Sequence, residues 1–188
     1  MSIFNKIGLW NAWIFMCVFL LQLLIILLLK KSGSQRSHVP DDARRTRFEK
    51  YIGNTANILW LLLLGYSIFL PLLPDTFWFY IGLSIYVLGV LLLLFATVSF
   101  ILRPGDKMIK DGVYQFSRHP MYLATFLICL GTGIASVSYS FIVISILLVL
   151  CLHQEALVEE RYCLKMYDDV YKEYMKKVPR WIGIPESA

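Results

Sequence analysis

Charged residues are scarce in this 188-residue chain, at 16%, while hydrophobic residues make up 58%. Soluble domains carry about 25% charged residues, so this composition and a mean hydropathy of +0.64 exclude an ordinary soluble domain. Basic residues exceed acidic ones, 18 against 13. The composition indicates a membrane protein, in which the placement of the positive charges sets the topology.

Cysteine motifs and nucleotide-binding loops are also missing. The four cysteines lie in or beside apolar segments without paired spacing, which excludes a disulfide framework and a cysteine-ligated zinc site. There is no glycine-rich loop after a strand, no Walker sequence and no nucleic-acid-binding module. We therefore expect no nucleic-acid partner, and any cofactor has to bind between helix ends and loops.

Long apolar segments predict an all-α, polytopic membrane bundle of five transmembrane helices, because about 20 helical residues cross a hydrocarbon core of about 30 Å. Leu9–Leu29 has this length, and Ile58–Leu73 is a shorter second span. Phe77–Leu102 follows a tight turn in which Asp75 is the expected helix cap. Met121–Leu152 is too long for one crossing, and its small residues predict a hairpin of two short spans.

The basic residues predict the orientation. Seven follow the first span in a cytoplasmic connector at 30–53, four follow the third span and six follow the fifth, while only Lys6 lies on the opposite side. This places the N-terminus outside and the C-terminus in the cytoplasm; four crossings would put the basic tail on the wrong side. Three helices would then occupy residues 1–102, and a core at 103–188 would end in an amphipathic helix from about His153 to Trp181.

The loop before the fourth span contains Arg118, His119 and Pro120. Proline fits the first position of a helix, where its missing N–H costs nothing. The free backbone N–H groups at that helix start would be those of Met121, Tyr122 and Leu123. With the helix dipole behind them they suit a carboxylate or phosphate. The alternative is structural: Arg118 reaches the headgroups and His119 caps the helix.

Two glutamates follow the fifth span. Glu155 and Glu159 share a helix face, so they repel each other unless a positive group lies between them. That group can be a basic residue of the tail, a cationic ligand, or a metal assisted by His153 and His119, although these histidines lack a recognised ligand spacing. The alternative is a solvated helix start in which Glu160 pairs with nearby basic residues. We expect no metal.

Arg180 and Trp181 end the tail. Their simplest role is anchoring at the membrane interface, where tryptophan lies at headgroup level. A functional Arg180 would have to turn inward.

Three segments together resemble a known family: "DGVYQFSRHPMY" (111–122), "EERYC" (159–163) and "YDDVYKEYMKKVPRW" (167–181). Their order and spacing are similar to the isoprenylcysteine carboxyl methyltransferase and phospholipid methyltransferase superfamily of integral membrane enzymes. The resemblance covers roughly residues 103–181. It implies methyl transfer from S-adenosylmethionine to a lipid or lipidated nucleophile.

The resemblance also implies three groups of cofactor-binding residues. The amino-acid end of the cofactor would lie against His119, Pro120, Met121 and Tyr122. Its nucleoside would be surrounded by Lys107, Met108, Ile109 and Tyr114. Its positive end would face Glu159, with Glu160 beside it.

Two positions depart from the family. An arginine often stands four residues before the first glutamate, and in the isoprenylcysteine enzymes it contacts the substrate carboxylate; this chain has Glu155 there. Glu155 would repel a carboxylate acceptor but could take a proton from an amine. Arg180 is then the residue expected to orient the acceptor. The second departure is Tyr167-Asp168 in place of the usual Phe-Gly, at a helix turn.

Other functions remain open. Amine N-methylation, as in a phospholipid methyltransferase, and thiol S-methylation are alternatives to carboxyl methylation. A non-catalytic lipid-binding protein would keep the same bundle. A channel or carrier needs ionisable groups at membrane depth; the first three spans contain almost none, and the lone Gln22 inside the first span is better explained by a hydrogen bond between helices.

Overall fold

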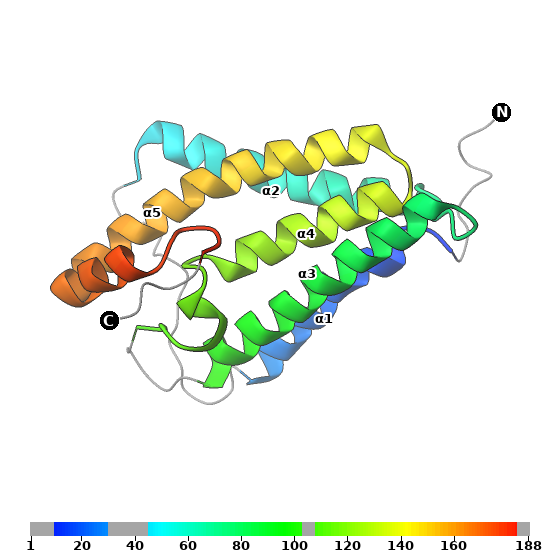
Figure 1. Cartoon of the computed structure of the whole chain (residues 1–188). Coiled ribbons are helices and arrows are strands. Elements are labelled where there is room, and N and C mark those ends of the chain that lie inside the picture. The colour runs from blue at the N-terminus through cyan, green and yellow to red at the C-terminus, as the bar shows by residue number, and fades with distance from the viewer. Residues whose placement is uncertain (1–9, 30–44, 103–107, 184–188) are drawn as a thin grey trace.

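The computed structural model describes residues 10–29, 45–102 and 108–183, which form a bundle of helices without a strand in these ranges (Figure 1). The elements are α1 (Trp13–Leu29), α2 (Arg47–Ser67), α3 (Phe77–Leu102), the short 3₁₀-helix η2 (Gly112–Gln115), α4 (Pro120–Ala135) and α5 (Tyr139–Lys177). The predicted all-α class is confirmed.

The α4–α5 hairpin is the centre of the bundle. Helix α4 packs on α3, α5 packs on both α4 and α2, and α1 lies along α3 (Figure 1). Glycines allow the α3–α4 contact: a Cβ at Gly131 would lie 2.6 Å from the carbonyl oxygen of Gly82. Small residues bring helix backbones together in this way where lipid removes the hydrophobic drive for association. The start of α4 is thereby held against the C-terminal half of α5.

Two helices of the described part are long and apolar enough to cross a membrane, Phe77–Ile101 and Tyr139–Lys177. Helices α1 and α4 are also apolar but shorter, with 17 and 16 residues. Many large aliphatic side chains of the bundle point outward, among them Leu20, Leu88 and Leu150. An apolar outer surface of this kind fits lipid rather than water, as expected of a membrane protein.

Helix α2 lies earlier in the chain than predicted. The connector predicted to extend to residue 53 is already helical from Arg47, and the predicted span end at Leu73 is wrong because the helix stops at Ser67. A capping box fixes the start: the Glu49 N–H donates to Thr46 Oγ1 at 3.3 Å, and the Thr46 N–H donates to Glu49 Oε2 at 2.9 Å. Residues 30–44 of the predicted connector lie outside the described residues.

The predicted cap of α3 is also wrong. The Phe79 N–H donates to the hydroxyl oxygen of Thr76 at 3.3 Å, so Thr76 rather than Asp75 caps this helix.

The hairpin within Met121–Leu152 is confirmed. Its turn is short and contains Val137 at φ 49°, and Ser138 caps α5 by accepting the Phe141 N–H at 3.3 Å. The three residues between α4 and α5 are too few to separate them, so the two helices run antiparallel.

The prediction of a separate tail helix starting at His153 is wrong. Helix α5 continues through that point, because no glycine or proline interrupts the helical pattern there. Its one irregular residue is Asp168, at φ 39° and ψ −116°, which kinks the helix at the second family departure.

Candidate active site

The start of α4 meets α5 in a compact group that we call the polar cluster: His119, Tyr122, Glu159 and Glu160. The His119 ring lies between the two carboxylates, with Nδ1 3.4 Å from Glu159 and Nε2 3.2 Å from Glu160. The ring also stacks on Tyr122, with centroids 5.6 Å apart, and the Tyr122 hydroxyl donates a short hydrogen bond to Glu159. Residues about 40 positions apart in the chain thus form one site.

The electrostatics of the cluster favour a charged imidazole. Burial lowers the pKa of His119, but hydrogen bonds and charge attraction from Glu159 and Glu160 outweigh burial. The net pKa is raised above the ordinary value of 6.5.

Glu160 is the buried centre of the ion pairs, with 3% of its side chain exposed. Arg180 donates to it through Nε and Nη2, both at 2.9 Å, and Arg118 Nη2 lies 3.5 Å from Oε1. With the contact from His119, both carboxylate oxygens have partners. Arg180 therefore turns inward, as a functional arginine must, but one edge of its guanidinium is bound to Glu160.

The segment after α5 runs beside the loop before α4. The Arg118 N–H donates to the Pro179 carbonyl at 3.1 Å, and the Gly183 N–H donates to the Phe116 carbonyl at 3.1 Å. These backbone bonds and the Arg180–Glu160 pair join the tail to the polar cluster.

The start of α4 offers fewer free amides than predicted. The N–H groups of Tyr122 and Leu123 both donate to the His119 carbonyl, at 3.1 and 3.2 Å. The prediction of three free groups is wrong for these two, because the residue that precedes a helix accepts its first hydrogen bonds. The Met121 N–H has no acceptor among the described residues. Arg118 adds positive charge at this helix start. Its Nε and Nη1 atoms are buried without a hydrogen-bond partner in the described part of the chain.

The nucleoside residues named above lie around the same end of the bundle. Tyr114 is in η2, and its carbonyl accepts a hydrogen bond from the Tyr174 hydroxyl at 2.6 Å. Met108 packs against the small core formed by this part of α5, and Ile109 is partly buried. Lys107 lies outside the described residues.

Glu155 has a partner that the sequence analysis missed. Arg45, just before α2, contacts both its oxygens: Nη1 lies 3.1 Å from Oε1 and Nη2 lies 2.9 Å from Oε2. The side chains are 15% and 13% exposed. Gly53 makes room for the pair, since a Cβ there would lie 2.8 Å from Glu155 Oε1. The positive group expected beside Glu155 is thus Arg45. In the sequence, only the need of Glu155 for a cation indicated such a partner.

His153 packs against the segment after α5. Its ring stacks on Trp181, with centroids 5.9 Å apart. Within the described residues, no group of three His, Cys, Asp or Glu side chains is placed to hold a metal ion.

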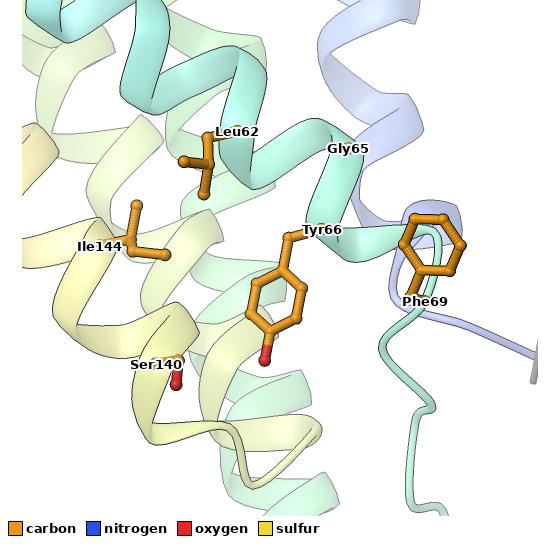
Figure 2. Close-up of a pocket in the computed structure, with 6 residues that line it drawn as sticks. All are labelled: Leu62, Gly65, Tyr66, Phe69, Ser140 and Ile144. Atoms are coloured by element: carbon orange, nitrogen blue, oxygen red, sulfur yellow. The ribbon is translucent and has the colours of Figure 1, made fainter. Parts of the chain in front are cut away.

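A shallow, open groove lies at the other end of the α2–α5 contact (Figure 2). Ile144 in the groove and Glu155 are eleven positions apart on α5, which is about 16 Å along a helix. Because its lining is uncharged, the groove is distinct from the polar cluster. Its lining residues are Leu62, Gly65, Tyr66, Phe69, Ser140 and Ile144.

Comparison with known proteins agrees with this geometry. The model of a family described as phospholipid methyltransferase matches residues 76–170, which is half of the chain. The chain belongs to the phospholipid methyltransferase family. The match includes α3, α4 and the part of α5 that carries Glu159, so the polar cluster lies within the family region.

Two curated members of the wider superfamily are similar to this chain. They are the protein-S-isoprenylcysteine O-methyltransferases of Schizosaccharomyces pombe and Saccharomyces cerevisiae, each 35% identical over 79 residues. The aligned segment is 42% of this chain and 33% and 32% of the two relatives. The chain thus matches about a third of the length of each relative.

Proposed function

We propose that the protein is a membrane-embedded, S-adenosylmethionine-dependent methyltransferase. It would act on a lipid or lipidated acceptor, as an isoprenylcysteine carboxyl O-methyltransferase does. The observation that carries this proposal is the contact between the start of α4 and Glu159 on α5. Because a carboxylate and a helix start suit opposite charges, this contact offers complementary partners for the two ends of a zwitterion.

The chain's own residues fit the cofactor. Of the two adjacent glutamates, Glu159 is 35% exposed and can meet a cationic group, while the oxygens of Glu160 are bound to protein donors. The Met121 N–H and the unpartnered atoms of Arg118 supply donors for a carboxylate. The bound cofactor would supply an electrophilic methyl group on a sulfonium.

The other proposed contacts follow the family resemblance. Pro120 sets the α4 start, and Tyr122 orients the Glu159 carboxylate through its hydroxyl. Met108, Ile109 and Tyr114, together with Lys107, would enclose the nucleoside.

A carboxylate acceptor fits this site better than an amine. A carboxylate needs no base, so methyl transfer depends on positioning and on exclusion of water. Glu155 is the nearest candidate base, and both its oxygens are bound to Arg45. Arg180 is likewise bound to Glu160, so orientation of the acceptor would fall to its remaining Nη1.

The proposed topology has five crossings, with the N-terminus outside and the C-terminus in the cytoplasm. Residues 1–102 would form the three N-terminal spans and residues 103–188 the methyltransferase core. The distribution of basic residues supports this arrangement. The cofactor would then enter from the cytoplasm and the acceptor sideways from the bilayer.

The first test is calorimetry of the purified protein with S-adenosylhomocysteine. Glu159→Gln should weaken binding about 10- to 100-fold, because hydrogen bonds to charged groups contribute about 1.5–3 kcal/mol. Glu173→Gln, on the exposed face of α5, is the matched control and should leave binding unchanged. No binding by the wild-type protein at millimolar ligand would end the proposal.

The second test identifies the acceptor group. Membranes incubated with radiolabelled S-adenosylmethionine are separated into lipid, protein and volatile fractions. Base-labile label on protein is expected for a methyl ester on a prenylated cysteine. Stable label on lipid amines would instead support N-methylation of a phospholipid, and the family description names phospholipid methylation.

A further inference from the structure

One edge of the Arg45 guanidinium is unused. A guanidinium presents two edges that fit an oxyanion, an end formed by Nη1 and Nη2 and a side formed by Nε and Nη2. Glu155 occupies the end edge, at 3.1 and 2.9 Å. Arg45 Nε, on the side edge, is buried and has no hydrogen-bond partner among the described residues. Arg180 is the opposite case, because its side edge is bound to Glu160.

A buried cationic N–H without an acceptor is rare in folded proteins, and its bonding can be completed by water, by an ion or by the oxyanion of another molecule. The guanidinium of Arg45 is also fixed before any ligand arrives. Glu155 holds its end edge, Gly53 places it directly against the α2 backbone, and the capping box anchors the next residue, Thr46. A donor that is already oriented loses little freedom on binding.

Arg45 lies close to the polar cluster. Glu155 and Glu159 are one turn apart on the same face of α5. Arg45 is bound to Glu155, and Glu159 accepts the hydrogen bond of the Tyr122 hydroxyl. An anion on the side edge of Arg45 would therefore be near the point where the cofactor's positive end is proposed to lie.

We propose that the side edge of Arg45 binds the oxyanion of the methyl acceptor, a carboxylate or phosphate head, with Glu155 as the residue that positions Arg45. This inference rests on the proposed methyltransferase function. It removes the objection raised by Glu155, because a paired glutamate no longer presents a net negative charge to an anionic acceptor. Arg45, just before α2, would then replace the arginine that the family often has at the position of Glu155 on α5.

The test compares paired probes that differ in one group, with the full-length protein in detergent and saturating S-adenosylhomocysteine. N-acetyl-S-farnesylcysteine should bind at least about tenfold more tightly than its carboxamide, since charge-assisted bonds are about twice as strong as neutral ones. Lysophosphatidic acid and monoacylglycerol form the phosphate pair. The pair with the larger ratio shows whether a carboxylate or a lipid phosphate is the preferred source of the oxyanion.

Three variants then assign the preference to a residue. Arg45→Lys keeps the positive charge opposite Glu155 but lacks the planar guanidinium fork. The ratio of the affinities for the charged and the neutral probe should therefore fall to about 1–3. Glu155→Gln should keep most of the preference, because Arg45 remains. The exposed Arg47→Lys is the matched control and should behave as wild type.

Different results test the role of Arg45 and the methyltransferase proposal. Equal binding of charged and neutral probes by the wild-type protein, or an unchanged ratio in Arg45→Lys, would overturn the role of Arg45. Failure to bind S-adenosylhomocysteine would instead overturn the methyltransferase proposal. The probe ratios measured without that ligand would still test Arg45. S-adenosylhomocysteine affinity should change less than about twofold in Arg45→Lys, because Arg45 is not placed in the cofactor site.

Discussion

Replacement of Asp168 by glycine should stabilise the protein, although glycine normally weakens a helix. Asp168 has φ 39° and ψ −116°, a conformation that costs a residue with a Cβ about 1–3 kcal/mol. Glycine adopts it freely but loses about 0.5–1 kcal/mol more in conformational entropy on folding. The aspartate side chain is 74% exposed and shares Lys172 with Asp169, so its ion pair contributes little. The expected net gain for Asp168→Gly is about 1 kcal/mol.

The neighbouring residue supplies a control of opposite sign. Asp169 is also exposed, at 86%, and contacts the same Lys172, but its backbone is helical. Asp169→Gly should therefore lose about 1 kcal/mol. Both values can be measured by reversible unfolding in mixed micelles, followed by far-UV circular dichroism. If the two variants are destabilised equally, the argument from backbone strain is wrong.

Three further predictions concern the polar cluster and the helix contacts. Glu160→Gln should lose at least about 3 kcal/mol of stability, because it removes the buried carboxylate that pairs with Arg118 and Arg180. The exposed Glu173→Gln should leave stability unchanged, and a loss below about 1 kcal/mol for Glu160→Gln would contradict the buried ion-pair assignment. The raised pKa of His119 means that its contribution to stability is complete below the unfolded value of 6.5 and is lost as pH rises through the higher folded value. His119→Gln should therefore flatten the fall in stability that begins above pH 6.5, and an unchanged slope would show that another group titrates. Gly131→Ala should cost about 1–3 kcal/mol, since its Cβ would lie 2.6 Å from a backbone oxygen of α3, whereas Gly65→Ala, with open space around it, should be neutral or stabilising in the same unfolding assay.

The cluster residues were predictable because two local rules place them. Proline at the first position of a helix sets where α4 begins, and the helical period fixes which faces carry Tyr122 and Glu159. The length of the apolar run Met121–Leu152 and the small residues within it then indicate that the two helices form a hairpin. The pairing of Arg180 with Glu160 and of Arg45 with Glu155 was not predictable, because it depends on how elements far apart in the chain pack together.

The start of α2 shows a signal that was present but not used. Thr46 followed three residues later by Glu49 is the pattern of a capping box, and it precedes the apolar run of this helix. Hydropathy alone placed the helix at the apolar residues, so its polar first turns were assigned to a connector. Those turns hold Arg45 and Gly53 against α5.

The bond between Arg180 and Glu160 sets an order of events during biosynthesis. The ribosome makes α4 and all of α5 before it reaches Arg180, which neutralises the buried Glu160. The apolar helices can therefore enter the lipid while Glu160 is still hydrated at the surface. A nascent chain released before residue 180 would keep its membrane helices but leave the Glu160 carboxylate without the Arg180 guanidinium. Protein quality control could recognise such a chain by this unpaired carboxylate.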